Sequence, residues 1–203
     1  MASPKILLPT LAAGTSAASV GGYMYATSGN KEVTILDKIK DSLKTHHRIL
    51  TSKGDSAWDK FKKVYKEGGD KKISGVSEEQ INGWCESTLE ESFNKEKYDQ
   101  AMMWCVIYDR SIKESLSKPV LSAEKTDEKW KKAWDKFNTG NSTAGELKLE
   151  DTALNNPTPN DRDKGGSALN EWCTSKYEMK MYELGAEALS KKVEKWCNED
   201  AGK

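Results

Sequence analysis

The sequence predicts an all-α protein: an N-terminal hydrophobic helix of the transmembrane type, followed by a helical domain made of two duplicated helical repeats. Three observations predict this. Lys, Glu, Asp, Ser and Ala dominate the composition, and no stretch alternates between apolar and polar residues as a half-buried strand does. The first 30 residues contain one charged side chain, Lys5. A set of Trp and Cys positions occurs twice along the rest of the chain.

The charge balance narrows the functional classes. The 203 residues include 32 Lys and Arg and 32 Asp and Glu, so the formal net charge is zero. This balance argues against a protein that binds nucleic acid through bulk electrostatics. The hydrophobic fraction of 36% is too low for a multi-spanning membrane protein but sufficient for a helical core.

The N-terminal segment, residues 1–31, is predicted to be a membrane segment with a short linker. No charged residue occurs from Ile6 to Asn30, a run of 25 residues. About 20 helical residues cross the hydrocarbon core of a bilayer, so a helix within residues 6–27 is long enough to span it. Lys5 and the terminal amine favour a cytoplasmic N-terminus. We therefore expect a single-pass protein of the cell membrane with most of the chain outside the cell.

Two alternatives to an anchor stay open. The segment can be a signal peptide, with a small-residue exit at 16–18 or 24–26, and cleavage of residues 1–26 would then secrete the protein. It can also be a buried or disordered Ala- and Gly-rich terminus.

Apolar periodicity and capping signals predict the helices in order. In the first repeat, residues 32–118, helices are expected over about 32–50, 55–67, 77–89 and from 94 to before Pro119. In the second repeat, residues 119–203, they are expected over about 126–138, 167–180 and 182–198. Residues 139–166 are rich in Asn, Gly, Pro and Thr and predict a long loop.

The duplication is indicated by paired motifs. Each of the four cysteines directly follows a tryptophan, in the pairs Trp84-Cys85, Trp104-Cys105, Trp172-Cys173 and Trp196-Cys197. The sequence AWDKF at 57–61 recurs letter for letter at 133–137. The order of the three motifs is the same in both halves, which predicts an internal duplication. One register stays open, because Trp58 can correspond to Trp134 or, by its spacing to the next aromatic residue, to Trp130.

The cysteine spacing suggests one disulfide in each repeat, Cys85–Cys105 and Cys173–Cys197. Each would join two consecutive helices and stabilise the fold by about 3 kcal/mol, and each would need an oxidising exterior. Four buried free thiols are one alternative, and a four-cysteine metal site is another. No Cys-x-x-Cys motif occurs, which disfavours a zinc ribbon or a redox motif.

The seven tryptophans are predicted to form the cores of the repeats, because the aromatic residues recur at helical spacing. They are Trp58, Trp84, Trp104, Trp130, Trp134, Trp172 and Trp196. An exposed aromatic binding face is the alternative.

No motif predicts catalysis, a cofactor or a metal site. The only histidines, His46 and His47, are adjacent on an expected helix and would point in different directions. No nucleophile elbow, Walker loop or dinucleotide fingerprint occurs. Asn141-Ser-Thr143 is a glycosylation sequon. The sequence therefore predicts a protein that is not an enzyme.

In combination, these features resemble the large paralogous families of uncharacterised proteins in haemotropic mycoplasmas. The segment LAAGTSAASVGGYMYA is followed by Ile49-Leu50, Asp55, Trp58 and Tyr65, and then by a charged region with repeated Trp-Cys pairs. The resemblance covers most of the chain. It implies a surface-exposed, antigenically variable protein without an established activity or catalytic residues.

These observations predict a surface binding or antigen module that contacts host-cell or host-serum proteins and no nucleic acid. Its exposed helix faces and residues 139–166 would form the contact surface. A scaffold tethered on the cytoplasmic side is an alternative that predicts free thiols. An enzyme without a recognisable motif is the third class, and it predicts convergent ionisable groups in a cleft.

Overall fold

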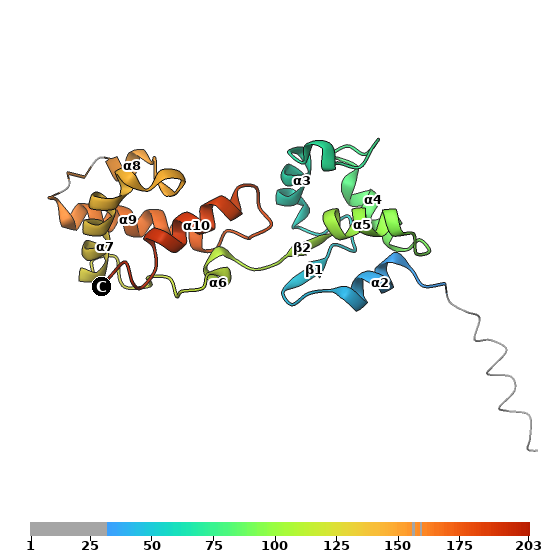
Figure 1. Cartoon of the computed structure of the whole chain (residues 1–203), viewed down its shortest axis with the longest axis horizontal. Coiled ribbons are helices and arrows are strands. Elements are labelled where there is room, and N and C mark those ends of the chain that lie inside the picture. The colour runs from blue at the N-terminus through green and yellow to red at the C-terminus, as the bar shows by residue number, and fades with distance from the viewer. Residues whose placement is uncertain (1–31, 156, 159) are drawn as a thin grey trace, which may run out of the picture. The chain divides into compact units, whose positions relative to one another are not determined.

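A computed structural model describes residues 32–155, 157–158 and 160–203 (Figure 1). The predicted membrane segment, residues 6–27, and both alternatives for it lie outside these residues. Within the described ranges, no helix has the length and apolar character needed to cross a bilayer. Residues Thr34–Lys203 form one compact unit.

The compact unit is mostly helical, which confirms the predicted helical character of the domain. Its α-helices are α2 (Ile35–Ser42), α3 (Trp58–Lys66), α4 (Ile81–Leu89), α5 (Lys95–Trp104), α6 (Ile112–Ser115), α7 (Glu128–Gly140), α8 (Thr152–Asn155), α9 (Arg162–Tyr177) and α10 (Ala186–Trp196). Single 3₁₀ turns lie at η1 (Gly69–Lys71), η2 (Asn141–Thr143) and η3 (Gly145–Leu147).

A short antiparallel sheet corrects two predicted helices. Strand β1 (His47–Ile49) pairs with β2 (Val106–Tyr108), with Arg48 opposite Ile107. The expectation of no sheet was therefore wrong, and so were the continuous helices over 32–50 and from 94 to before Pro119. The first ends at Ser42, and His46 then adopts a left-handed conformation (φ 64°) that a helix does not contain. Residues 106–108 are Val, Ile and Tyr, which favour a strand.

Two hydrophobic clusters form the core of the unit. The first gathers buried residues between Ile35 and Ile107, and the second gathers buried residues between Ile112 and Ala201. Figure 1 shows α2, α3, α4 and α5 around the short sheet, and α7 lying against α9. Each cluster therefore belongs to one copy of the duplicated motifs. From here on, the first repeat is the copy that contains the first cluster, and the second repeat is the copy that contains the second cluster.

The second repeat begins earlier than predicted. The backbone N–H of Ile35, at the start of α2, donates to the carbonyl of Glu91 (3.0 Å), and that of Ile112, at the start of α6, donates to Met179 (2.8 Å). A capping box begins both helices. In the second repeat, α6 thus makes the contacts that α2 makes in the first. The residues that match between the two repeats therefore begin at Ser111 in the second repeat. The predicted boundary between residues 118 and 119 lies inside that repeat.

Residues 139–166 were predicted to form a long loop, but several of the described residues in this range are helical. The range contains η2, η3, α8 and the start of α9. The side-chain amide of Asn141 donates to the carbonyl of Leu149 (3.0 Å) and accepts from its backbone N–H (2.8 Å). Leu149 and Leu154 are buried in the second cluster. The two leucines and the Asn141 bonds hold this segment against the core, and the sequon amide is engaged in that structure.

Candidate functional site

The four cysteines form two disulfides in equivalent places. Cys85 of α4 is bonded to Cys105 at the end of α5, with an S–S distance of 2.04 Å. Cys173 of α9 is bonded to Cys197 at the end of α10, with an S–S distance of 2.07 Å. All four side chains are buried. The structure thus contains the disulfide pairs that the sequence suggested, in place of free thiols or a shared four-cysteine metal site.

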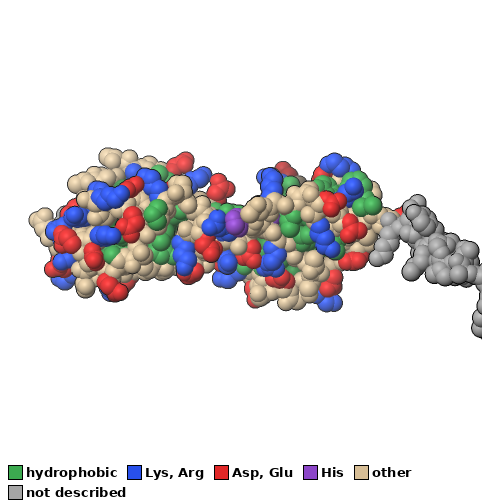
Figure 2. Space-filling view, turned by 90° about the horizontal axis from the view of Figure 1, so that it is seen from below, with side chains coloured by type: hydrophobic (Ala, Val, Ile, Leu, Met, Phe, Trp, Pro, Cys, Tyr) green, Lys and Arg blue, Asp and Glu red, His purple; other side chains and the backbone are tan. Residues whose placement is uncertain are grey.

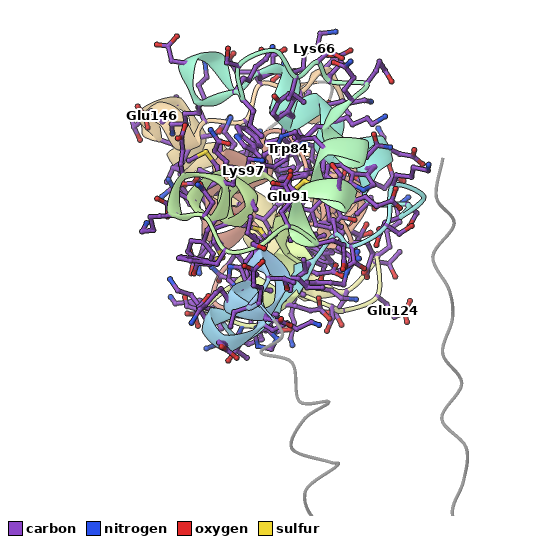
Figure 3. All side chains as sticks on the ribbon, turned by 90° about the vertical axis from the view of Figure 1, so that its right-hand side faces the viewer. Lys66, Trp84, Glu91, Lys97, Glu124 and Glu146 are labelled. Atoms are coloured by element: carbon purple, nitrogen blue, oxygen red, sulfur yellow. A yellow bond between two sulfur atoms is a disulfide. The ribbon has the colours of Figure 1, made fainter. Side chains whose placement is uncertain are left out.

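Five of the seven tryptophans lie in the buried core: Trp58, Trp104, Trp130, Trp134 and Trp196. Trp84 and Trp172, which precede the first cysteine of each disulfide, are only partly buried and pack against the outside of the two clusters. Trp84 is labelled in Figure 3, on the same side of the molecule as Lys97 and Glu91. Five of the seven tryptophans thus lie in the core as predicted, and the other two lie at its edge.

The second tryptophan of each repeat has the same surroundings. The indole N–H of Trp104 donates to the carbonyl of Lys71 (2.9 Å), and that of Trp196 donates to Leu147 (2.8 Å). In each repeat this N–H satisfies a backbone acceptor near a 3₁₀ turn, so the ring fixes the connection that follows α3 or α7.

In each repeat, this tryptophan also contacts an aromatic ring and a glycine. Trp104 meets Tyr65 edge to face, with centroids 4.7 Å apart and planes at 80°, and Trp196 meets Phe137 at 5.4 Å and 79°. A Cβ atom at Gly68 would lie 2.7 Å from Cη2 of Trp104. The matching distance from Gly140, which follows Phe137 by the same three residues, to Trp196 is 3.1 Å. The disulfide, indole, ring and glycine therefore form one framework, present twice.

This framework settles the open register. The indole N–H of Trp58 donates to the carbonyl of Ser52 and that of Trp130 donates to Ala123, both at 3.0 Å. Nε1 of Trp134 is buried and has no partner among the described residues. Trp58 therefore corresponds to Trp130. The letter-for-letter AWDKF match is displaced by four residues, about one helical turn, from the structural equivalence.

A cluster of charged groups lies where β1 and the end of β2 meet residue 180. Nε of Arg48 donates to Oδ2 of Asp109 (2.9 Å), and its guanidinium also bonds the carboxylate of Asp55. Nζ of Lys180 lies 3.2 Å from Oδ1 of Asp109. We call these four residues the Arg48 cluster.

The pKa shifts in the Arg48 cluster indicate a structural role. The hydrogen bonds from Arg48 lower the pKa of both Asp55 and Asp109, and the hydrogen bond to Asp55 raises the pKa of Arg48. A general acid or base needs a pKa near the working pH, whereas these carboxylates remain ionised and paired at neutral pH. The cluster therefore ties the end of the first repeat to the second.

An apolar groove of about 610 Å³ lies beside β2. Its walls include Phe61, Val64 and Met103 of the first repeat and Tyr182 and Leu184 of the second. Met103 and Leu184 are 49% and 50% exposed. On the face seen in Figure 2, acidic and basic side chains are intermixed over much of the surface. The groove is thus a place where large apolar side chains remain open to a ligand.

In the part of the chain that the structure describes, no group of three His, Cys, Asp or Glu side chains is arranged to hold a metal ion. His47 is the first residue of β1 and His46 directly precedes it, and Nδ1 of His47 is 3.1 Å from the carbonyl oxygen of Thr45. Comparison with known proteins finds no matching family model, no similar curated protein and no similar solved structure. Function is therefore inferred from the residues of the chain itself.

Proposed function

We propose that the chain is a membrane-anchored binding and display module on the cell surface, without catalytic activity, that contacts host-cell or host-serum proteins. The main observation behind this proposal is that both repeats contain the same buried framework but carry different residues on their surfaces. The disulfide, the indole and the glycine recur in both repeats. A scaffold that keeps its buried contacts and changes its exposed residues suits recognition.

Two neighbouring positions illustrate the difference between the surfaces. The residue before the framework tryptophan is Met103 in the first repeat and Lys195 in the second. The residue before the framework ring is Val64 in the first repeat and Lys136 in the second. The change from apolar to cationic side chains leaves the buried framework unchanged, so the two repeats present different chemistry on one design.

The disulfides support a location outside the cytosol. Disulfides persist in oxidising surroundings and are reduced in most cytosols. Each of the two closes a stretch of 20 or 24 residues, and such a bond stabilises a fold by about 3 kcal/mol. A scaffold that faces the cytoplasm would keep four thiols instead. The resemblance to the paralogous mycoplasma families implies the same surface location and adds antigenic variation to the proposed role.

Protease treatment of intact cells tests this proposal. Cells that express the chain are treated with a non-penetrating protease, and the released peptides are analysed by mass spectrometry without reduction. The expected result is peptides from residues 32–203 in which Cys85 is linked to Cys105 and Cys173 to Cys197. A cytoplasmic protein followed in the same samples reports cell integrity. Protection of the chain in intact cells, with all four thiols alkylated, would overturn the proposal.

A further inference from the structure

Strand β2 has one edge that β1 does not use. The backbone N–H of Leu50 donates to the carbonyl of Cys105 (2.8 Å), and that of Asp109 donates to His46 (2.9 Å). Bonded pairs alternate along an antiparallel ladder, so residues 105, 107 and 109 bond toward β1. Val106 and Tyr108 consequently direct their N–H and C=O groups to the opposite edge.

The second repeat already occupies the continuation of that edge. The backbone N–H of Met181 donates to the carbonyl of Arg110, and that of Ile112 donates to Met179, both at 2.8 Å. Beyond Met181 the chain turns away, with the N–H of Glu183 donating to the carbonyl of Lys180 (2.9 Å). Among residues 32–155, 157–158 and 160–203, which the structure describes, pairing therefore stops at Arg110 and leaves the edge at Val106 and Tyr108 open. An open strand edge is a template for another strand.

Two hollows border this open edge: the apolar groove, and a second hollow whose lining includes Lys44 and His47. The 610 Å³ groove and a second hollow of about 220 Å³ are both lined by Val106 and Tyr108. Phe61 and Met103 add to the first, and Leu43 and Met102 add to the second. Successive side chains of an extended strand point to opposite faces. A strand added to this edge would thus turn every second side chain toward the apolar groove.

The second repeat shows that the framework does not require this apolar edge. Lys136 and Lys195 stand there in place of Val64 and Met103, and Asn198 and Asp200 follow the disulfide where Val106 and Tyr108 do in the first repeat. At the equivalent positions of the second repeat, the backbone carbonyls already accept hydrogen bonds from the same repeat. Nζ of Lys136 donates to the carbonyl of Asp200 (2.7 Å), and the backbone N–H of Ala201 donates to the carbonyl of Asn198 (2.9 Å).

The charges beside the groove define the chemistry of its ligand. Nζ of Lys60 lies 3.4 Å from Glu183, and Nζ of Lys191 lies 3.2 Å from Glu187. The two acidic residues that line the 610 Å³ groove are thus each paired with a lysine, so this groove favours an uncharged ligand segment over an ionic one. Part of the apolar wall is already covered by Tyr182, whose ring meets that of Phe61 edge to face at 6.5 Å.

We infer that the open edge of β2 binds an extended, uncharged segment of a partner protein, which adds as a short strand beside Val106–Tyr108 and places an apolar side chain in the groove. Backbone hydrogen bonds supply affinity in this mode of recognition and the hollows supply specificity. The inference rests on the proposed function and names the partner class of that binding surface. Peptide binding by the purified chain does not depend on where the chain resides in the cell, so its failure is distinguishable from that of the surface location.

The probe is the fluorescein-labelled peptide acetyl-Ser-Val-Thr-Leu-Thr-Val-Ser-amide, added to the full chain in nanodiscs, with empty nanodiscs as the blank. Fluorescence anisotropy is expected to rise saturably. The same peptide with alternate backbone nitrogens methylated, in both registers, is expected to bind at least about tenfold more weakly, because an N-methyl group blocks the ladder. Absence of saturable binding overturns the inference, and so does equal binding of the methylated peptides.

Two variants locate the site. Met103→Lys introduces the residue that the second repeat carries, on a half-exposed helix position, and is expected to weaken binding at least about tenfold. Lys195→Met is the matched control in the second repeat and is expected to leave binding unchanged. Leu184→Lys, also half-exposed, gives an independent charge at the groove and is expected to weaken binding. Circular dichroism verifies the fold of each variant. Full binding by both folded groove variants overturns the inference.

Discussion

Gly68 lies against the edge of the Trp104 indole, so closely that a Cβ atom would stand 2.7 Å from Cη2 of the ring. The same relation, at 3.1 Å, exists between Gly140 and Trp196. In both repeats the glycine follows the aromatic residue that meets the indole edge to face. The absence of a side chain lets the chain turn at the end of α3 while the ring stays buried.

We predict that Gly68→Ala destabilises the protein by about 1–3 kcal/mol, because the added methyl group must displace a buried ring. Gly140→Ala is expected to cost less, since its contact is longer. Gly83→Ala is the control: it lies in α4 with nothing within 4 Å of the new methyl group and is expected to stabilise by about 0.5–1 kcal/mol. Urea unfolding measures the three free energies. If Gly68→Ala and Gly83→Ala lower the free energy of unfolding equally, the close contact between Gly68 and Trp104 does not determine stability.

Removal of either disulfide is expected to have a similar effect, because the closed stretches have similar lengths, 20 and 24 residues. The double variants Cys85→Ala/Cys105→Ala and Cys173→Ala/Cys197→Ala should each lower the free energy of unfolding by about 3 kcal/mol. Thermal unfolding of the wild type with and without a reductant provides an independent comparison. A reductant that leaves the unfolding temperature of the fully reduced protein unchanged would contradict this expectation.

The Arg48 cluster predicts a loss of stability in acid. The folded-state pKa of Asp55 and of Asp109 is lowered by Arg48, so their contribution is complete above the ordinary Asp pKa of about 3.9 and is lost as pH falls through the lowered values. We expect about 1 kcal/mol for such a partly exposed pair. Urea unfolding between pH 6 and pH 2 should show a smaller acid loss for Asp109→Asn than for the wild type. Asp70→Asn, at an exposed position, should follow the wild-type curve.

The structural register predicts an order among tryptophan replacements. Trp58→Phe and Trp130→Phe each remove a hydrogen bond to a backbone carbonyl and should cost about 1 kcal/mol more than Trp134→Phe, whose Nε1 has no partner among the described residues. Chemical unfolding of the three single variants, on otherwise identical chains, gives the comparison. If Trp134→Phe is as costly as Trp130→Phe, the hydrogen bond is not the feature that distinguishes the two positions.

Local signals in the sequence predicted much of the framework. Repeated Trp-Cys pairs at matched spacing indicated both the duplication and the disulfide pairs, because a short motif that occurs four times needs no knowledge of distant contacts. The helices α3, α4 and α7 lie close to the predicted ranges, since capping residues and apolar periodicity act within one or two turns. Both strands were missed because each depends on a partner that lies about 60 residues away in the chain.

The sequence by itself thus predicted the helical class, the duplication and the candidate disulfides, all of which depend on composition and short-range spacing. Tertiary structure alone decided that Trp58 matches Trp130, that Leu149 and Leu154 are buried in the second cluster, and that no described residue pairs with the β2 edge at Val106. The physical reason is the same in each case. Which hydrogen bond an indole makes, which leucine is buried and which strand edge is paired depend on residues far away in the chain, and only folding brings them together.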